Sequence, residues 1–100
     1  MKYYNYTPHK ICLNDGRSFE SAGLARVSSS FSEISGDECQ QIFGEVEGLP
    51  DHQSGVKIIV SAMVLAASDR KDLVAPATGH PKTIRNDKGH IISVPCFISK

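Results

Sequence analysis

Residues 70–91 concentrate side chains that could bind an anion. The segment reads RKDLVAPATGHPKTIRNDKGHI and contains five lysines and arginines, two histidines, two prolines and two glycines. Thr78 and Gly79 offer a hydroxyl and backbone amides, and the neighbouring cations offer the N–H donors that a phosphate accepts. The sequence therefore predicts a site for a phosphate-containing small molecule, formed by Arg70, Asp72, Thr78, Gly79, His80, Lys82, Arg85 and Asn86.

The same segment has a second interpretation that involves no ligand. Arg70 and Arg85 would then pair with Asp72 or Asp87 at the surface, and the prolines and glycines would only shape a connection. The sequence leaves both interpretations open.

Thr7, Pro8 and His9 form a second candidate site. Pro8 has a fixed φ angle, so it restrains the position of the histidine that follows it. A histidine titrates near neutral pH and suits proton transfer or hydrogen bonding to a ligand. Thr7 and His9 therefore join the predicted ligand-binding residues. The alternative is that His9 only satisfies a backbone carbonyl.

Specific signatures of catalysis or metal binding do not occur in the sequence. The four histidines include no pair four residues apart, and the three cysteines include no Cys-x-x-Cys pair. No Gly-x-Ser-x-Gly, phosphate-loop or dinucleotide motif is present. Glu45 and Glu47 would face one side of a strand and could act as an acid–base pair, but a solvated strand face explains them as well. We therefore expect no metal and no cofactor, and we favour a non-catalytic protein.

The composition is that of one ordinary globular domain over residues 1–100. Eleven lysines and arginines balance eleven aspartates and glutamates, so nucleic acid is not an expected partner. The longest apolar stretch, residues 58–67, is about half the ~20 residues that a membrane-spanning helix needs. The odd, widely spaced cysteines fit a reducing compartment. We predict a cytoplasmic protein without membrane contact.

Turn-forming residues divide the first half of the chain into short strands. Asn14, Asp15 and Gly16 lie between β-forming runs and predict a hairpin. Residues 24–34 alternate loosely between apolar and small polar types, as a half-exposed strand does. Residues 39–47 predict a strand with a bulge, although a short capped helical turn at residues 35–38 is an alternative.

The second half predicts a strand, a helix and a final hairpin. Residues 56–60 are largely β-branched, and helix formers follow with Ser61 as the N-cap. The helix is apolar on nearly every side, which predicts that the core surrounds it. A turn at residues 86–89 predicts a hairpin that closes the sheet. The predicted fold class is α+β: a mostly antiparallel small sheet or partly open barrel of about six short strands, with one short buried helix at about residues 61–70.

Four stretches resemble a family of small proteins of bacteria and tailed phages. They are Asn-x-Thr-Pro-His at residues 5–9, Phe-Gly-Glu-Val-x-Gly-Leu-Pro at residues 43–50, Ile-Val-Ser at residues 59–61, and a tail with Arg-x-Asp, Pro-x-Thr-Gly and Arg-Asn-x-x-Gly-x-Ile between residues 70 and 91. The resemblance covers most of the chain and implies membership of the family, but it brings no activity with it. The chain departs from the pattern at Ala77, where an aspartate often precedes Thr-Gly, and at His80, which is inserted before Pro81.

Two functions from different classes are consistent with these residues. The first is a small non-catalytic accessory protein of phage or prophage type that binds a host protein or a nucleotide-like anionic small molecule. The second is a small hydrolase or phosphotransfer enzyme that uses His9 or His80 as a base and Arg70 or Arg85 as an anion clamp. Pairing of sheet edges into a homo-oligomer is a third, structural role.

Overall fold

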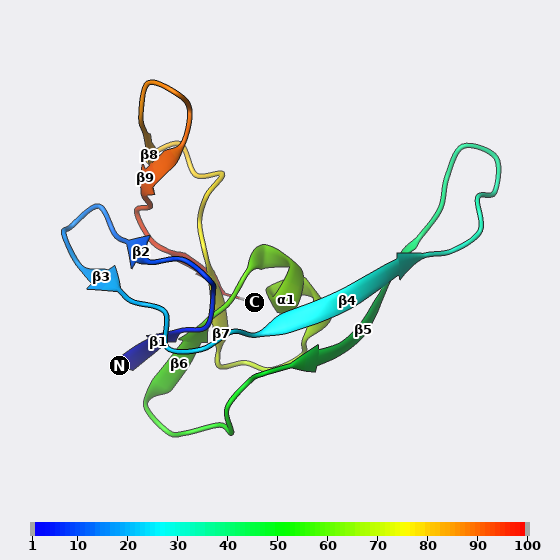
Figure 1. Cartoon of the computed structure of the whole chain (residues 1–100), viewed down its shortest axis with the longest axis horizontal. Coiled ribbons are helices and arrows are strands. Elements are labelled where there is room, and N and C mark those ends of the chain that lie inside the picture. Colours follow the sequence, from blue (N-terminus) through cyan, green and yellow to red (C-terminus); the bar gives the residue numbers. More distant parts are fainter. Residues whose placement is uncertain (1, 100) are drawn as a thin grey trace.

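The computed structural model describes residues 2–99, which form ten short strands and one helix (Figure 1). In chain order the elements are β1 (Lys2–Asn5), β2 (Ile11–Cys12), β3 (Ser18–Phe19), β4 (Arg26–Phe31), β5 (Gln41–Glu47), β6 (Val56–Ile59), α1 (Ala62–Ala67), β7 (Leu73–Pro76), β8 (Ile84–Arg85), β9 (Ile91–Ser93) and β10 (Phe97–Ser99). The α+β class is confirmed at this coarse level. The prediction of about six strands is wrong, because irregular segments divide the chain into shorter pieces. Within residues 2–99 the strands form four small sheets and no closed barrel.

The largest sheet has four strands in the order β1-β6-β7-β10. β1 and β7 both run parallel to β6, and only β10 is antiparallel to its neighbour. The expected antiparallel pairing therefore holds for the three two-stranded sheets and fails for most of this one. The reason lies in residues 60–72, which include α1 and carry the chain back to the end of the sheet where β6 began.

Helix α1 begins where the sequence predicts and ends earlier. The Ser61 hydroxyl accepts a hydrogen bond from the Val64 amide at 3.2 Å, which confirms Ser61 as the N-cap. The helix ends at Ala67 instead of residue 70, because Ser68 is extended and its hydroxyl accepts the Arg70 amide. Only one face of the helix is buried, so the expectation of a core on nearly all sides is also wrong. No helix within residues 2–99 is long and apolar enough to span a membrane.

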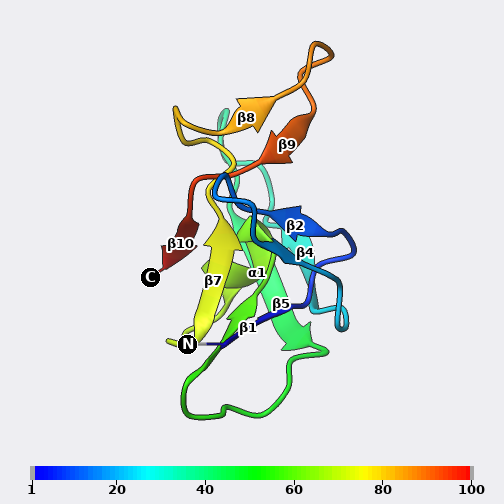
Figure 2. The same cartoon turned by 90° about the vertical axis from the view of Figure 1, so that its left-hand side faces the viewer.

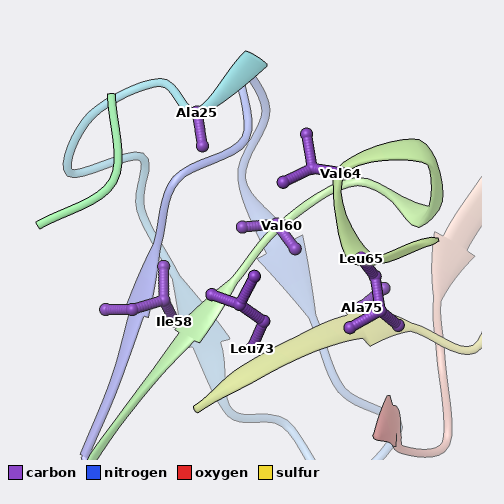
Figure 3. Close-up of a cluster of buried hydrophobic side chains, with 7 residues drawn as sticks. All are labelled: Ala25, Ile58, Val60, Val64, Leu65, Leu73 and Ala75. Carbon is purple, nitrogen blue, oxygen red and sulfur yellow. The ribbon is translucent and has the colours of Figure 1, made fainter. Parts of the chain in front are cut away.

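A compact apolar cluster joins the central sheet to α1 (Figure 3). Its side chains come from β6, β7, the helix and the segments that enter β4 and α1, and the residues are Ala25, Ile58, Val60, Val64, Leu65, Leu73 and Ala75. Val27 of β4 and Val46 of β5 pack against the cluster from outside. The base of the β4–β5 sheet is therefore fixed to the core, whereas its far end is not.

Two hairpins are confirmed, although the second has a different place in the fold from the one predicted. β2 pairs with β3 around Gly16, whose φ of 98° suits glycine. β8 pairs with β9 around the turn at residues 86–89. The second hairpin does not close the sheet, because β8 and β9 form their own two-stranded sheet and β10 joins β7 instead. Residues 82–93, which contain β8 and β9, are called the C-terminal hairpin below.

β4, β5 and their connecting loop form an arm, residues 26–47, that extends away from the other elements (Figure 1). The two strands pair antiparallel, and the register shifts between Val27 and Ser29. Ser28 lies opposite Gly44, and a Cβ at Gly44 would collide with the Ser28 hydroxyl. The predicted strand with a bulge is therefore confirmed, and glycine is needed there because of the close approach.

Candidate functional site

The segment that leaves β7 folds into consecutive turns. The Thr78 amide donates to the Pro76 carbonyl at 2.9 Å, and the His80 amide donates to the Ala77 carbonyl at 3.2 Å. The Thr83 hydroxyl also donates to the Ala77 carbonyl, at 2.8 Å. Thr78, Gly79 and His80 are exposed at the outside of these turns. The hydroxyl and amides predicted to face a ligand are therefore at the surface.

His80 has a defined ring orientation. Its Nδ1 atom accepts a hydrogen bond from the Lys82 backbone amide at 3.0 Å. A neutral histidine that accepts at Nδ1 carries its proton on Nε2, so the ring presents an N–H donor at its outer edge. The turn therefore presents a directed donor at its surface, and the Lys82 side chain is exposed as well.

Arg85 and Asn86 shape the C-terminal hairpin. The Arg85 guanidinium donates to the Gly89 carbonyl at 3.0 Å and to the Thr78 carbonyl at 3.2 Å, which ties the hairpin to the preceding loop. The Asn86 side-chain oxygen accepts backbone amides two and four residues further on. Both side chains remain exposed, so these bonds position the cation without burying it.

Arg70 and Asp72 form a fork-shaped ion pair. Arg70 Nε donates to Asp72 Oδ1 at 2.9 Å and Nη2 donates to Oδ2 at 2.6 Å, while Nη1 donates to the Pro50 carbonyl at 2.8 Å. The Asp72 side chain is only 5% exposed. Hydrogen bonds from Arg70 hold the pKa of Asp72 below its ordinary value. The same bonds to the Asp72 carboxylate raise the pKa of Arg70. Asp72 pairs with Arg70, as the interpretation without a ligand predicts, but Asp72 is buried while the Arg70 side chain is 31% exposed.

Thr7 and His9 belong to a turn organised by Asn5, which is almost fully buried. Asn5 Oδ1 accepts from the Thr7 amide at 2.9 Å and lies 2.6 Å from the Thr7 hydroxyl. Asn5 Nδ2 donates to the carbonyls of His9 at 2.7 Å and Phe19 at 2.9 Å. Thr7 is therefore internal, and only the His9 side chain of this pair is exposed.

The ten predicted residues do not form one cluster. Arg70 and Asp72 precede β7, whereas residues 78–86 follow it, so the two groups lie at opposite ends of the strand (Figure 2). Thr7 and His9 follow β1, whose carboxyl end lies on the same side of the sheet as that of β7 because both strands run parallel to β6. One end of the sheet therefore holds eight of the ten residues.

Asn14 is a linking residue that the sequence did not single out beyond its turn. Its Nδ2 donates to the Lys82 carbonyl at 2.9 Å, and its Oδ1 accepts from the Ser93 hydroxyl at 2.6 Å. The two partners lie 68 and 79 residues away in sequence, so no local pattern could reveal them. Asn14 attaches the C-terminal hairpin to the β2–β3 hairpin and fixes its position.

The largest described hollow lies at the Arg70 end of β7. It measures about 580 Å³, is open to solvent, and is lined by Glu45, Leu49, Asp69 and Arg70 among others. Most Arg70 donors already bond Asp72 and Pro50, and two carboxylates line the same hollow. An anion is therefore poorly suited to it.

Within residues 2–99 no group of three or more histidine, cysteine, aspartate or glutamate side chains is placed to hold a metal ion. The three cysteines are free thiols. Comparisons with protein-family models, curated proteins and solved structures found no match to this chain. Function is therefore inferred from the side chains and surfaces described above.

Proposed function

We propose that this chain is a small non-catalytic accessory protein of phage or prophage type that binds an acidic protein partner through its C-terminal hairpin. A host protein is the expected partner of such an accessory protein. The single observation that carries the proposal is the chemistry of residues 82–93, where cations and exposed isoleucines share one projecting hairpin.

The charge of the hairpin differs from that of the whole chain. The hairpin contains three cationic side chains, Lys82, Arg85 and Lys88, and one carboxylate, Asp87. The chain as a whole is neutral. Within residues 2–99 the recorded ion pairs lie elsewhere, at Lys10–Glu20, Asp15–Arg17 and Arg70–Asp72. None of these recorded pairs involves Lys82 or Lys88, so the two lysines suit an acidic surface.

The isoleucines point to a protein partner rather than to a small ion. Ile84, Ile91 and Ile92 are 46%, 41% and 55% exposed on one short hairpin. A protein interface combines an apolar centre with a polar or charged rim, and this hairpin offers both. A nucleotide-like anionic ligand is the other form of the binding proposal, and the exposed Thr78 and the outer N–H of His80 support it.

The alternative enzyme needs a base and a guanidinium at one site. Arg70 and Arg85 lie at opposite ends of β7, and three Arg70 nitrogens donate to Asp72 and Pro50. His9 and His80 both lie at the Arg85 end of the sheet, so Arg85 is the guanidinium that could act with either base. Turnover of a generic phosphoester that disappears in Arg85→Ala and in His9→Ala or His80→Ala would support the enzyme.

Affinity capture from a bacterial lysate tests the proposed function. The wild-type chain is expected to retain an acidic protein that the Lys82→Glu/Lys88→Glu variant does not retain, and the purified protein should bind again with the same preference. Lys71→Glu serves as a matched control, because Lys71 is an exposed lysine at the other end of β7. Equal retention by the wild type and the hairpin variant would refute the hairpin as the binding surface. Thermal-shift assays with a panel of nucleotides test whether the chain binds a nucleotide-like ligand instead.

A further inference from the structure

The arm carries a second exposed apolar surface at its tip, residues 31–42. Phe31, Ile34 and Ile42 are 68%, 77% and 51% exposed. Only cross-strand contacts and a tight turn hold this end together, with backbone bonds between Ser35 and Glu38. A two-stranded sheet is marginally stable in water by itself, so a partner that covers the tip would stabilise it.

The arm tip is acidic where the C-terminal hairpin is basic. It contains Glu33, Asp37 and Glu38, and residues 27–56 contain no lysine or arginine at all. Glu33 and Glu38 line a hollow of about 350 Å³ together with neighbouring polar side chains. The arm tip therefore offers what the hairpin lacks: carboxylates around a concave surface, with apolar side chains beside them.

The molecule exposes more surface than a compact monomer of its mass. Its accessible area is 6918 Å², roughly 1,300 Å² more than the ~5,600 Å² expected for a folded chain of 10.9 kDa. The radius of gyration is 15.1 Å, against about 13 Å for a compact domain of 100 residues. The excess matches the total area of about 1,200–2,000 Å² that one specific protein interface buries.

We propose that the arm tip of one copy binds the C-terminal hairpin of a second copy, so that the chain assembles head to tail. This inference rests on the proposed function, because it names the acidic partner of the same hairpin. Each copy contributes one arm tip and one hairpin, which together make one interface per chain. The excess accessible surface of each chain, roughly 1,300 Å², is about the area that one such interface buries.

The charges select this arrangement over the symmetric ones. Two arm tips would bring carboxylates together, and two hairpins would bring cations together, and both contacts are repulsive. Figure 1 shows the hairpin at the upper left and the arm tip at the far right, so one copy does not join its own two surfaces. The contact is therefore between copies, and because its two sides differ it generates a ring or an open filament.

Analytical ultracentrifugation of the purified full-length chain tests this proposal. At low salt the mean mass is expected to rise with concentration above 10.9 kDa. At about 1 M salt, where the Debye length is ~3 Å, the association constant should fall at least about tenfold.

Two charge-reversed variants identify the surfaces. Glu33→Lys/Glu38→Lys alters the arm tip and Lys82→Glu/Lys88→Glu alters the hairpin, and all four side chains are exposed. Each variant by itself should remain monomeric, because its arm tip and its hairpin carry like charges. An equimolar mixture should associate, because an arm tip of one variant and a hairpin of the other again carry opposite charges. Circular dichroism and thermal melting establish that both variants fold.

Three results would overturn head-to-tail assembly. They are a wild type that stays monomeric at every concentration, two folded variants that do not associate when mixed, and variants that self-associate as the wild type does. A monomeric wild type that still retains an acidic lysate protein through Lys82 and Lys88 would leave the proposed function standing while this inference falls.

Discussion

Arg70 and Arg85 carry the same guanidinium group at opposite ends of β7, yet the two ends of the strand are built differently. Arg70 donates to a carboxylate that is 5% exposed, and to the Pro50 carbonyl. Arg85 donates to the Gly89 carbonyl of the exposed hairpin and to the Thr78 carbonyl of the exposed loop before it. The difference indicates that Arg70 contributes to stability at the first end of the strand, whereas Arg85 keeps its charge at the surface of the second end, where we propose that a partner binds.

Replacing Arg70 or Arg85 by alanine should reveal the largest difference in stability between the two ends of β7. Arg70→Ala leaves the Asp72 carboxylate buried and unpaired, so the free energy of unfolding should fall by about 3–4 kcal/mol. Arg85→Ala leaves carbonyls that water can reach, so its loss should stay below about 1 kcal/mol. Urea unfolding followed by circular dichroism measures both values. Similar losses for the two variants would remove the distinction between the ends.

Asn5 and Asn86 should differ in the same direction, with a smaller loss of unfolding free energy. Asn5→Ala removes the side-chain partner of the Phe19 carbonyl and of the Thr7 amide, and leaves the His9 carbonyl with the Thr7 hydroxyl as its donor, so it should cost about 2 kcal/mol of unfolding free energy. Asn86→Ala acts at an exposed turn and should cost less than about 1 kcal/mol. The same urea titration reads both variants. A larger loss for Asn86→Ala would contradict the assignment of Asn5 as the internal organiser.

The pH dependence of stability should arise largely from the Arg70 end. The pKa of Asp72 is lowered in the folded state from its ordinary value of 3.8, first by hydrogen bonds from Arg70. The stabilisation is therefore complete above that ordinary value and is lost as the pH falls through the folded-state pKa. Unfolding free energies measured from neutral to acidic pH should show this loss in the wild type and in Asp87→Asn, and less of it in Asp72→Asn. An unchanged slope in Asp72→Asn would contradict it.

Reversal of a single surface charge should have the smallest effect on stability. Partner binding should depend more on the Arg85 end of β7 than on the Arg70 end, the opposite of the ranking for stability. Lys82→Glu should weaken retention of an acidic partner several-fold, whereas Lys71→Glu should leave it within about twofold of the wild type, because Lys71 lies at the Arg70 end. Neither reversal should change stability by more than about 0.5 kcal/mol, since both side chains are exposed. Quantitative capture assays and thermal melting give the two readings. Greater dependence on Lys71 would reverse the roles of the two ends.

Local signals in the sequence predicted local structure well. Asp15 and Gly16 predicted the first hairpin because glycine tolerates a positive φ angle, and Ser61 predicted a helix start because its hydroxyl can accept a free amide. The bulge near Gly44 followed from a glycine inside a strand pattern.

Long-range pairing was not predictable from those signals. β1 pairs with β6 more than fifty residues away, and nothing local in Lys2–Asn5 distinguishes a parallel from an antiparallel partner. Arg70 and Asp72 lie only a few residues before Thr78 in sequence, which favours a single group with residues 78–86. β7 lies between Asp72 and Thr78 and separates them in space.

A titration of the ¹⁵N-labelled chain with polyglutamate tests most directly whether the C-terminal hairpin is the binding surface. Polyglutamate is a defined acidic polypeptide, and the amide signals report each residue separately. We expect saturable shifts concentrated in residues 82–93, which are lost in Lys82→Glu/Lys88→Glu. Shifts concentrated in residues 69–72, or spread evenly over all the cationic residues, would show that the hairpin is not the binding surface.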